Sequence, residues 1–224
     1  MSADKNIIEL KKSIPGHIKL VAVSKTKTAD EIMSVYNTGH KIFGENKVQE
    51  LVKKYEILPK DIEWHMIGHL QSNKVKYIAP FISLIHSVDS LKLLSIINKE
   101  AIKNNRVINC LLQFHIAKEE TKFGLSLEEA VEILESQEYN EMKNIKISGL
   151  MGMATFTENT EQIREEFKFL KNCFIKLKNK YFYDDNYFCE LSMGMTNDYQ
   201  IAIEEGSTIL RLGTLIFGER NYNN

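Results

Sequence analysis

The chain has 224 residues, of which 43% are hydrophobic and 26% are charged, a composition typical of soluble globular proteins with one sizeable core. Its 29 basic and 30 acidic side chains leave a net charge of -1, which argues against nucleic acid as the main partner. No apolar run is long enough to cross a membrane, and the first residues contain no apolar signal core.

The three cysteines, Cys110, Cys173 and Cys189, show neither the spacing of a metal site nor close pairing. Cys110 and Cys189 stand in apolar runs of strand length, where a free thiol behaves as a small hydrophobic side chain. We therefore expect reduced core cysteines, no metal site and a cytoplasmic protein.

Residues 1–17 predict a short amphipathic helix at 6–14 and a lead-in that contains Pro15 and Gly16. After them, apolar runs of strand length alternate with segments of helical periodicity. Strands are expected at 18–24, 41–44, 63–67, 83–88, 107–116, 145–150, 187–191 and 207–212. Helices are expected at 29–36, 46–57, 73–78, 89–104, 126–136, 160–178 and 196–205.

Cap residues support two of the predicted helices. Asp89 resembles an N-cap for the helix that runs to Asn104. Ser126, followed three residues later by Glu129, has the pattern of a capping box.

Strands that alternate with helices predict a parallel sheet, and eight such units predict a closed (β/α)8 TIM barrel. Too few residues follow the eighth strand for a full crossover helix, so we expect the N-terminal helix to fill that place in the outer ring. No linker or low-complexity tract divides the chain, and we expect a single domain over 1–224. An open doubly wound sheet is the main alternative, but no Gly-x-Gly-x-x-Gly follows the first strand.

The first strand ends in Lys25. Lysine is rarely buried, so Lys25 either marks the point where the strand meets water or is kept for its amine. A partly desolvated lysine amine loses its proton more easily and attacks carbonyl groups to form a Schiff base.

The loops after strands seven and eight often bind phosphate in such barrels. Here the loop at 192–197 offers a hydroxyl and backbone N–H groups, and Gly213 and Thr214 offer the same after the eighth strand. Turn residues and a helix cap are the alternative interpretation. Arg211 keeps its charge, so it must leave the barrel mouth or meet a partner inside. Because the eighth and first strands are neighbours, Arg211 and Lys25 lie side by side, which fits a phosphorylated aldehyde held covalently.

Five motifs carry a resemblance to a known family, and they occur in the same order as in that family: Val23–Lys27, Phe43–Asn46, Trp64–Gly68, Ser192–Met195 and Arg211–Thr214. Together they resemble the pyridoxal phosphate homeostasis protein family, which looks like the N-terminal barrel of alanine racemase standing alone. The resemblance runs from the first strand to the C-terminus.

The resemblance implies that pyridoxal 5′-phosphate (PLP) is bound as a Schiff base to Lys25 and that Arg211 faces its pyridine nitrogen. It also implies phosphate contacts from Ser192, Gly213 and Thr214. The full set of implied cofactor-binding residues is Lys25, Asn46, Ser192, Met193, Arg211, Gly213 and Thr214. The sequence departs from the family in a shorter N-terminal helix and in His69, where some members have proline.

An arginine at the pyridine nitrogen keeps that nitrogen unprotonated and weakens the ring as an electron sink. Racemisation would then depend on two well-placed bases, of which Lys25 supplies one. In alanine racemase the second comes from an added C-terminal domain, whereas this chain ends at Asn224 with Tyr222 in its tail. Strand histidines are more often structural than catalytic. The histidines in question are His65, His69, His86 and His115.

We therefore expect a monomeric PLP-binding protein that takes part in vitamin B6 and amino-acid homeostasis, with PLP-dependent apo-enzymes as candidate recipients and no assigned catalytic residue. A weak PLP-dependent amino-acid racemase is the first alternative, and a cofactor-free Schiff-base aldolase is the second. The roles of Lys27 and Lys74 stay open between a secondary PLP-reactive amine and a solvated charge.

Overall fold

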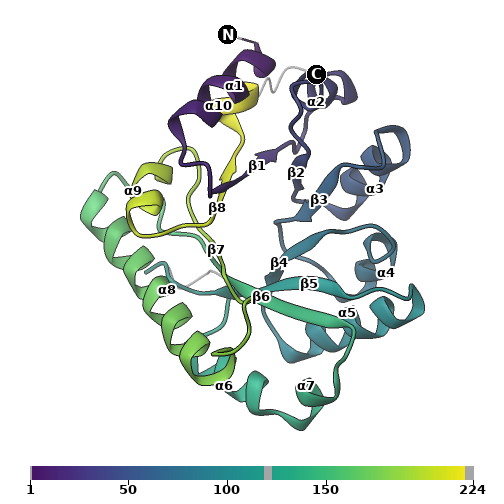
Figure 1. The fold of residues 1–224 in the computed structure, drawn as a ribbon, viewed down its shortest axis with the longest axis vertical. Helices are drawn as coiled ribbons and strands as arrows, with labels where there is room; N and C mark the ends of the chain where they lie inside the picture. The colour runs from purple at the N-terminus through teal and green to yellow at the C-terminus, as the bar shows by residue number, and fades with distance from the viewer. Residues whose placement is uncertain (1, 119–122, 220–224) are drawn as a thin grey trace.

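Eight parallel strands close into a barrel in the computed structural model, which describes residues 2–118 and 123–219 (Figure 1). Each strand pairs with the next, and the last pairs with the first. The strands are β1 (Lys19–Val23), β2 (Ile42–Glu45), β3 (Glu63–Met66), β4 (Leu84–Val88), β5 (Ile108–Phe114), β6 (Ile145–Gly152), β7 (Glu190–Ser192) and β8 (Ile209–Leu212). The predicted TIM barrel is confirmed. Tyr222 lies outside the described residues.

Helices surround this barrel and cover the outer face of its strands (Figure 1). Over the described part of the chain they are α1 (Ala3–Ser13), α2 (Ala29–Tyr36), α3 (Val48–Ile57), α4 (Val75–Ile78), α5 (Leu91–Lys103), α6 (Leu127–Glu135), α7 (Gln137–Glu141), α8 (Thr160–Tyr181), α9 (Tyr199–Glu204) and α10 (Thr214–Phe217), with a 3-10 turn, η1 (Ser72–Lys74), before α4. The short helices α7 and α10 were not expected from the sequence. None of the helices in 2–118 or 123–219 has the length and apolar composition needed to span a membrane.

The N-terminal helix fills the place of an eighth crossover helix, as predicted. It packs against α10, and the two lie side by side at the top of Figure 1. The Asn6 side-chain amide donates a hydrogen bond to the Ile216 carbonyl at 3.0 Å. The first and last elements of the barrel are therefore joined directly.

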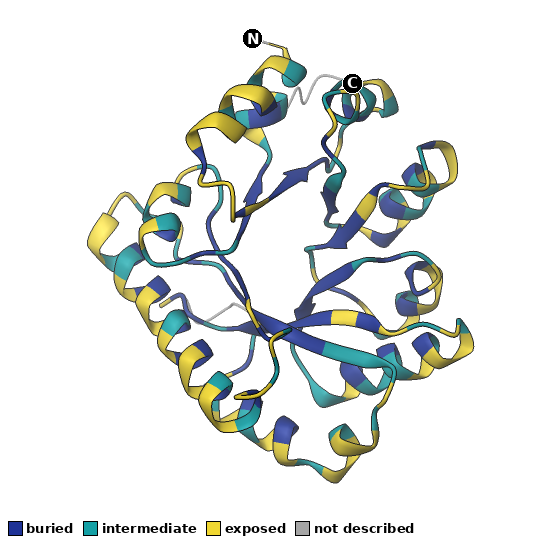
Figure 2. Cartoon of the chain, in the orientation of Figure 1, coloured by how far each residue is buried: buried dark blue, intermediate teal, exposed yellow. Residues whose placement is uncertain are grey.

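Strand alternation divides the core into two parts. On β1, Leu20 and Ala22 pack under the helices, whereas Val21 points into the barrel. The interior cluster consists of Val21, Leu84, Leu111, Met151 and Ile209. Figure 2 shows the strands as an almost continuous buried ring inside helices whose outer faces are exposed.

Two sequence-based expectations are corrected. Ser90 rather than Asp89 caps α5, because the Ser90 hydroxyl accepts the Leu93 N–H at 3.3 Å. The predicted seventh strand at 187–191 is instead β7 at Glu190–Ser192, and Cys189, which directly precedes it, is exposed rather than buried. The capping box of Ser126 and Glu129 is confirmed.

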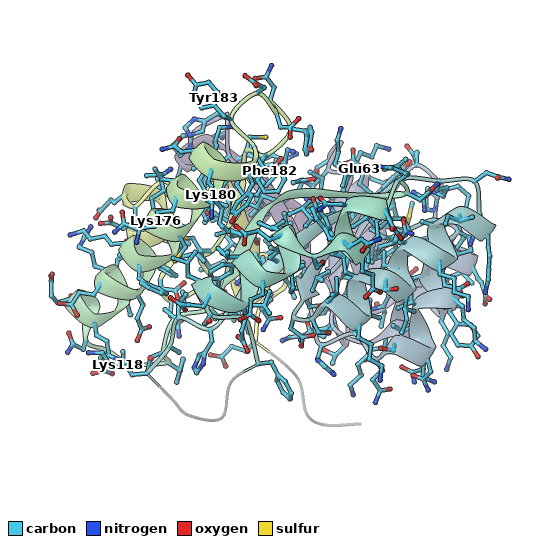
Figure 3. All side chains as sticks on the ribbon, turned by 90° about the horizontal axis from the view of Figure 1, so that it is seen from below. Glu63, Lys118, Lys176, Lys180, Phe182 and Tyr183 are labelled. Atoms are coloured by element: carbon cyan, nitrogen blue, oxygen red, sulfur yellow. The ribbon has the colours of Figure 1, made fainter. Side chains whose placement is uncertain are left out.

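The two ends of the barrel differ in their loops. Figure 3 shows Glu63, which begins β3, and Lys118, which follows β5, at opposite ends. The end near Lys118 carries the loops that follow the strands, where active sites of such barrels lie.

Candidate cofactor site

A cavity of about 390 Å³ opens at the carboxyl ends of the strands. This volume lies within the range of small-molecule sites. Of the seven predicted site residues, five line it: Lys25, Asn46, Arg211, Gly213 and Thr214. The barrel therefore brings together residues from the ends of β1, β2 and β8, as the neighbouring positions of these strands require.

Lys25 stands on a backbone that is held from several sides. The next residue, Thr26, has a φ of +66°, a left-handed conformation that is unfavourable for a threonine. The Thr26 N–H donates to Glu50 Oε2 at 2.9 Å, and the Lys54 amine donates to the Ser24 carbonyl at 2.8 Å. These contacts from α3 fix the chain on both sides of Lys25, which is half-buried.

The contact from α3 depends on a buried ion pair that sequence reasoning missed. Lys54 Nζ lies 2.7 Å from Glu45 Oε1, which also accepts the Ser24 hydroxyl at 2.6 Å. Burial raises the pKa of Glu45, and the nearby Lys54 opposes that shift. The signal was present, since Lys54 lies three residues after Leu51 and six after Val48, on the buried stripe of α3.

Arg211 meets partners inside the barrel. Only 4% of it is exposed, and its Nη1 donates to the Ser192 hydroxyl at 2.6 Å while Nη2 donates to the Gly152 carbonyl at 3.0 Å. Burial lowers the pKa of Arg211 to about 10, and Asp198 acts in the opposite direction. The guanidinium is still cationic at neutral pH.

Ser192 and Met193 are fully buried and do not line the cavity. The Ser192 hydroxyl contacts Arg211 and the His86 ring instead. The predicted phosphate contact of Ser192, and the predicted place of Met193 among the cofactor-binding residues, therefore stay predictions.

The loop after β7 differs from a simple anion-binding turn. Gly194 has a φ of +97°, and a Cβ there would lie 2.6 Å from the Ala202 Cβ. Asp198 accepts the Met195 N–H at 2.5 Å and so occupies one of the N–H groups that we expected to be open to an anion. Asp198, Thr196 and Asn197 line the cavity. Burial raises the pKa of Asp198.

The wall after β6 was largely missed from the sequence. Met153, Thr155 and Phe156 line the cavity, and Phe156 is 84% exposed at its rim. Glu166, in the second turn of α8, accepts both the Thr155 N–H at 2.6 Å and the Thr155 hydroxyl at 2.7 Å. This carboxylate anchors the wall to the longest described helix.

The two other lysines of interest lie away from the cavity wall. Lys27 donates to Glu31 at 3.1 Å and to the Phe217 carbonyl at 3.3 Å, which ties the β1 loop to α10. Lys74 lines a separate depression of about 200 Å³ together with His69 and Asn46. Asn46 therefore contributes to both cavities.

Comparison with known proteins identifies the family. Residues 2–221 match the family model of the alanine racemase N-terminal domain. The pyridoxal phosphate homeostasis protein of Aquifex aeolicus is 45% identical over 206 residues, which cover 91% of this chain and 88% of that protein. The chain belongs to the pyridoxal phosphate homeostasis protein family. The Escherichia coli member is 36% identical over 214 residues, covering 93% of this chain and 88% of its own.

Solved structures of similar proteins agree with the barrel described above. The structure of PipY from Synechococcus elongatus with PLP bound has a TM-score of 0.86 at 30% identity, covering 96% of this chain and all (100%) of that one. An alanine racemase of Clostridium difficile has a TM-score of 0.74 at 13% identity and covers 99% of this chain and 58% of that one. At that identity the second similarity shows the fold alone.

Proposed function

We propose that this chain binds PLP in the cavity at the carboxyl ends of the strands and holds it as a Schiff base on Lys25. The observation that carries the proposal is that Lys25, Arg211, Gly213 and Thr214 all line one cavity. The donor set fits the cofactor, because an aldehyde needs an amine and a phosphate needs cations, N–H groups and hydroxyls. Its relatives are named for PLP homeostasis, and PipY was solved with PLP bound.

Each residue has a distinct part in this proposal. Lys25 supplies the amine, and its backbone is held by Glu50 and Lys54. Arg211 is a donor only, so a ring nitrogen that faces it acts as an acceptor and stays unprotonated. Gly213 and Thr214 offer backbone N–H groups and a hydroxyl to the phosphate. When bound, PLP supplies an electron sink, which the unprotonated nitrogen weakens.

We propose a binding and regulatory role in PLP and amino-acid homeostasis rather than a robust enzyme activity. A racemase needs a base on each face of its substrate, and the described cavity lining offers Lys25 and Asp198 as proton-transfer groups. Asp198 favours the racemase alternative, but its carboxylate already accepts the Met195 N–H. As part of the same proposal, the chain is a single-domain cytoplasmic monomer that delivers PLP to apo-enzymes.

The test is a titration of the purified protein with PLP, followed by its visible absorbance. Wild-type protein should develop a visible band, Lys25→Ala should not, and the control Lys27→Ala should behave as wild type. Equal bands in all three proteins would contradict the proposal. If wild type rapidly interconverts D- and L-alanine and both Lys25→Ala and Asp198→Asn lose this activity, the racemase alternative would be correct and the proposed binding role would be wrong.

A further inference from the structure

A chain of buried polar side chains crosses the barrel interior beneath the cavity. It begins at Arg211 on β8, whose Nη1 donates to the Ser192 hydroxyl on β7 at 2.6 Å. His86 Nδ1, on β4, lies 3.0 Å from the same hydroxyl, and His86 Nε2 lies 3.0 Å from His65 Nδ1 on β3. None of the four residues is more than 4% exposed.

The hydrogen bonds of this chain run in one direction. Arginine has no acceptor, so the Ser192 oxygen must accept from Arg211. The Ser192 hydrogen then needs an acceptor, and His86 Nδ1 is the one in place among the described residues. A neutral imidazole that accepts at Nδ1 carries its hydrogen at Nε2. His86 therefore donates to His65 Nδ1, and His65 in turn carries its hydrogen at Nε2.

The charges agree with this direction. Burial lowers the pKa of His65 to about 3 and holds the pKa of His86 well below its usual value, with Arg211 adding to the effect on His86. Both rings are neutral at physiological pH, so the single positive charge of the chain is on Arg211. The last N–H, on His65, has room for hydration because His65 lines a polar cavity of about 250 Å³ at the amino-terminal end.

The arrangement fixes the plane of the guanidinium. Arg211 is anchored at Nη1 by Ser192 and at Nη2 by the Gly152 carbonyl, and two anchors set the orientation of a planar, rigid group. A serine that donates onward is also a stronger acceptor, because hydrogen bonds in a chain polarise one another.

We propose that Ser192, His86 and His65 are positioning residues, which hold the Arg211 guanidinium toward the ring of the bound cofactor. In this proposal the Ser192 hydroxyl holds Arg211 and does not contact the phosphate of the cofactor. This inference rests on the proposed PLP-binding function, and the first experiment below tests the chain without any cofactor.

The first experiment is ¹⁵N NMR of the imidazole nitrogens in the cofactor-free, ¹⁵N-labelled protein, with His86→Asn used for assignment. Both His65 and His86 should be neutral from pH 5.5 to pH 8 and should carry their hydrogen at Nε2. A hydrogen at Nδ1 of His86, or a charged ring at pH 7, would overturn the proposed chain even if PLP binds as expected.

The second experiment compares the affinities of Ser192→Ala for PLP and for pyridoxal, which lacks the phosphate. If Ser192 positions Arg211, both ligands should bind weaker by the same factor, on the order of tenfold. A loss for PLP alone would assign Ser192 to the phosphate and overturn the proposal. Ser148→Ala is the matched control, because Ser148 is also buried and, among the described residues, its hydroxyl donates to the Lys146 carbonyl and not to Arg211.

The third experiment uses His86. His86→Asn places an amide oxygen near the position of Nδ1 and should retain most of the affinity for pyridoxal, whereas His86→Leu should lose as much as Ser192→Ala. Equal affinities of His86→Leu and wild type would contradict the positioning role. Unfolding curves of each variant separate this loss from a loss of folded protein, and failure of wild type to bind PLP would contradict the proposed function instead.

Discussion

The amine of Lys54 donates to the carbonyl oxygen of Ser24 at 2.8 Å, so a buried lysine of α3 holds the residue that precedes Lys25. The same amine is paired with the buried Glu45 at 2.7 Å. The backbone of the proposed cofactor lysine is thus held by a second lysine, on the helix outside the barrel. Breaking this contact should lower the free energy of unfolding.

Lys54→Met removes the cation but leaves the Glu45 carboxylate buried. We expect a loss of about 3–5 kcal/mol in the free energy of unfolding, because an unpaired buried charge is strongly destabilising. Urea unfolding at pH 7.5 measures it. The double variant Glu45→Gln with Lys54→Met should recover a large part of the loss, since no uncompensated charge remains. A single variant as stable as wild type would show that the pair does not operate as described.

Gly194→Ala tests the close approach in the loop after β7. The added Cβ would lie 2.6 Å from the Ala202 Cβ and 2.8 Å from Leu210 Cδ2, at a φ of +97°. We expect destabilisation of about 2–4 kcal/mol, from overpacking together with backbone strain.

Gly39→Ala is the control for the strain alone. Gly39 has a φ of +84°, and nothing lies within 4 Å of an added Cβ. Its loss should be near 1 kcal/mol. Thermal unfolding of both variants compares their losses of stability. Equal losses would mean that the loop around residue 194 shifts to make room for the added Cβ.

Buried histidines should make the protein less stable in mild acid. Burial lowers the pKa of His40 to about 4 and that of His65 to about 3, both from 6.5. At a pH between the lowered pKa of the folded state and 6.5, these histidines bind more protons in the unfolded chain than in the folded one. The free energy of unfolding therefore falls as the pH drops below 6.5. Each group contributes a slope of about 1.4 kcal/mol per pH unit.

The raised pKa values of Glu45 and Asp198 act in the opposite direction, because those carboxyl groups bind protons more readily when folded. The effect of His40 is therefore measured as the difference between wild type and a variant that lacks this histidine. Urea unfolding of wild type and His40→Gln between pH 7.5 and pH 5 should show a smaller loss of stability in the variant. Parallel curves would mean that His40 is protonated in the folded state.

The barrel and the position of the cavity could be predicted from the sequence because topology determines them. Apolar runs of strand length alternate with helices, and a closed parallel barrel places every strand end on one face. Lys25 and Arg211 therefore had to face the same end of the barrel once β1 and β8 were neighbours, although the register pairs Arg211 with Val21 rather than placing it directly beside Lys25. This part of the site did not depend on any side-chain detail.

The role of Ser192 could not be predicted in the same way. The seventh strand was expected at 187–191, which leaves Ser192 in the loop, but β7 spans Glu190–Ser192 and carries that hydroxyl into the barrel. Pairing with β6 and β8, rather than local pattern, decides this boundary. Asp198 was missed for a related reason, because its burial results from how the loop folds back on Met195.

The central claim is that Lys25 carries the cofactor. The most direct measurement is borohydride reduction of the PLP-loaded protein, followed by peptide mass mapping. We predict a single major phosphopyridoxyl adduct on Lys25, with Lys27, Lys54 and Lys74 unmodified. A visible band whose reduced adduct lies on another lysine, or a protein that takes up no PLP, would contradict this account.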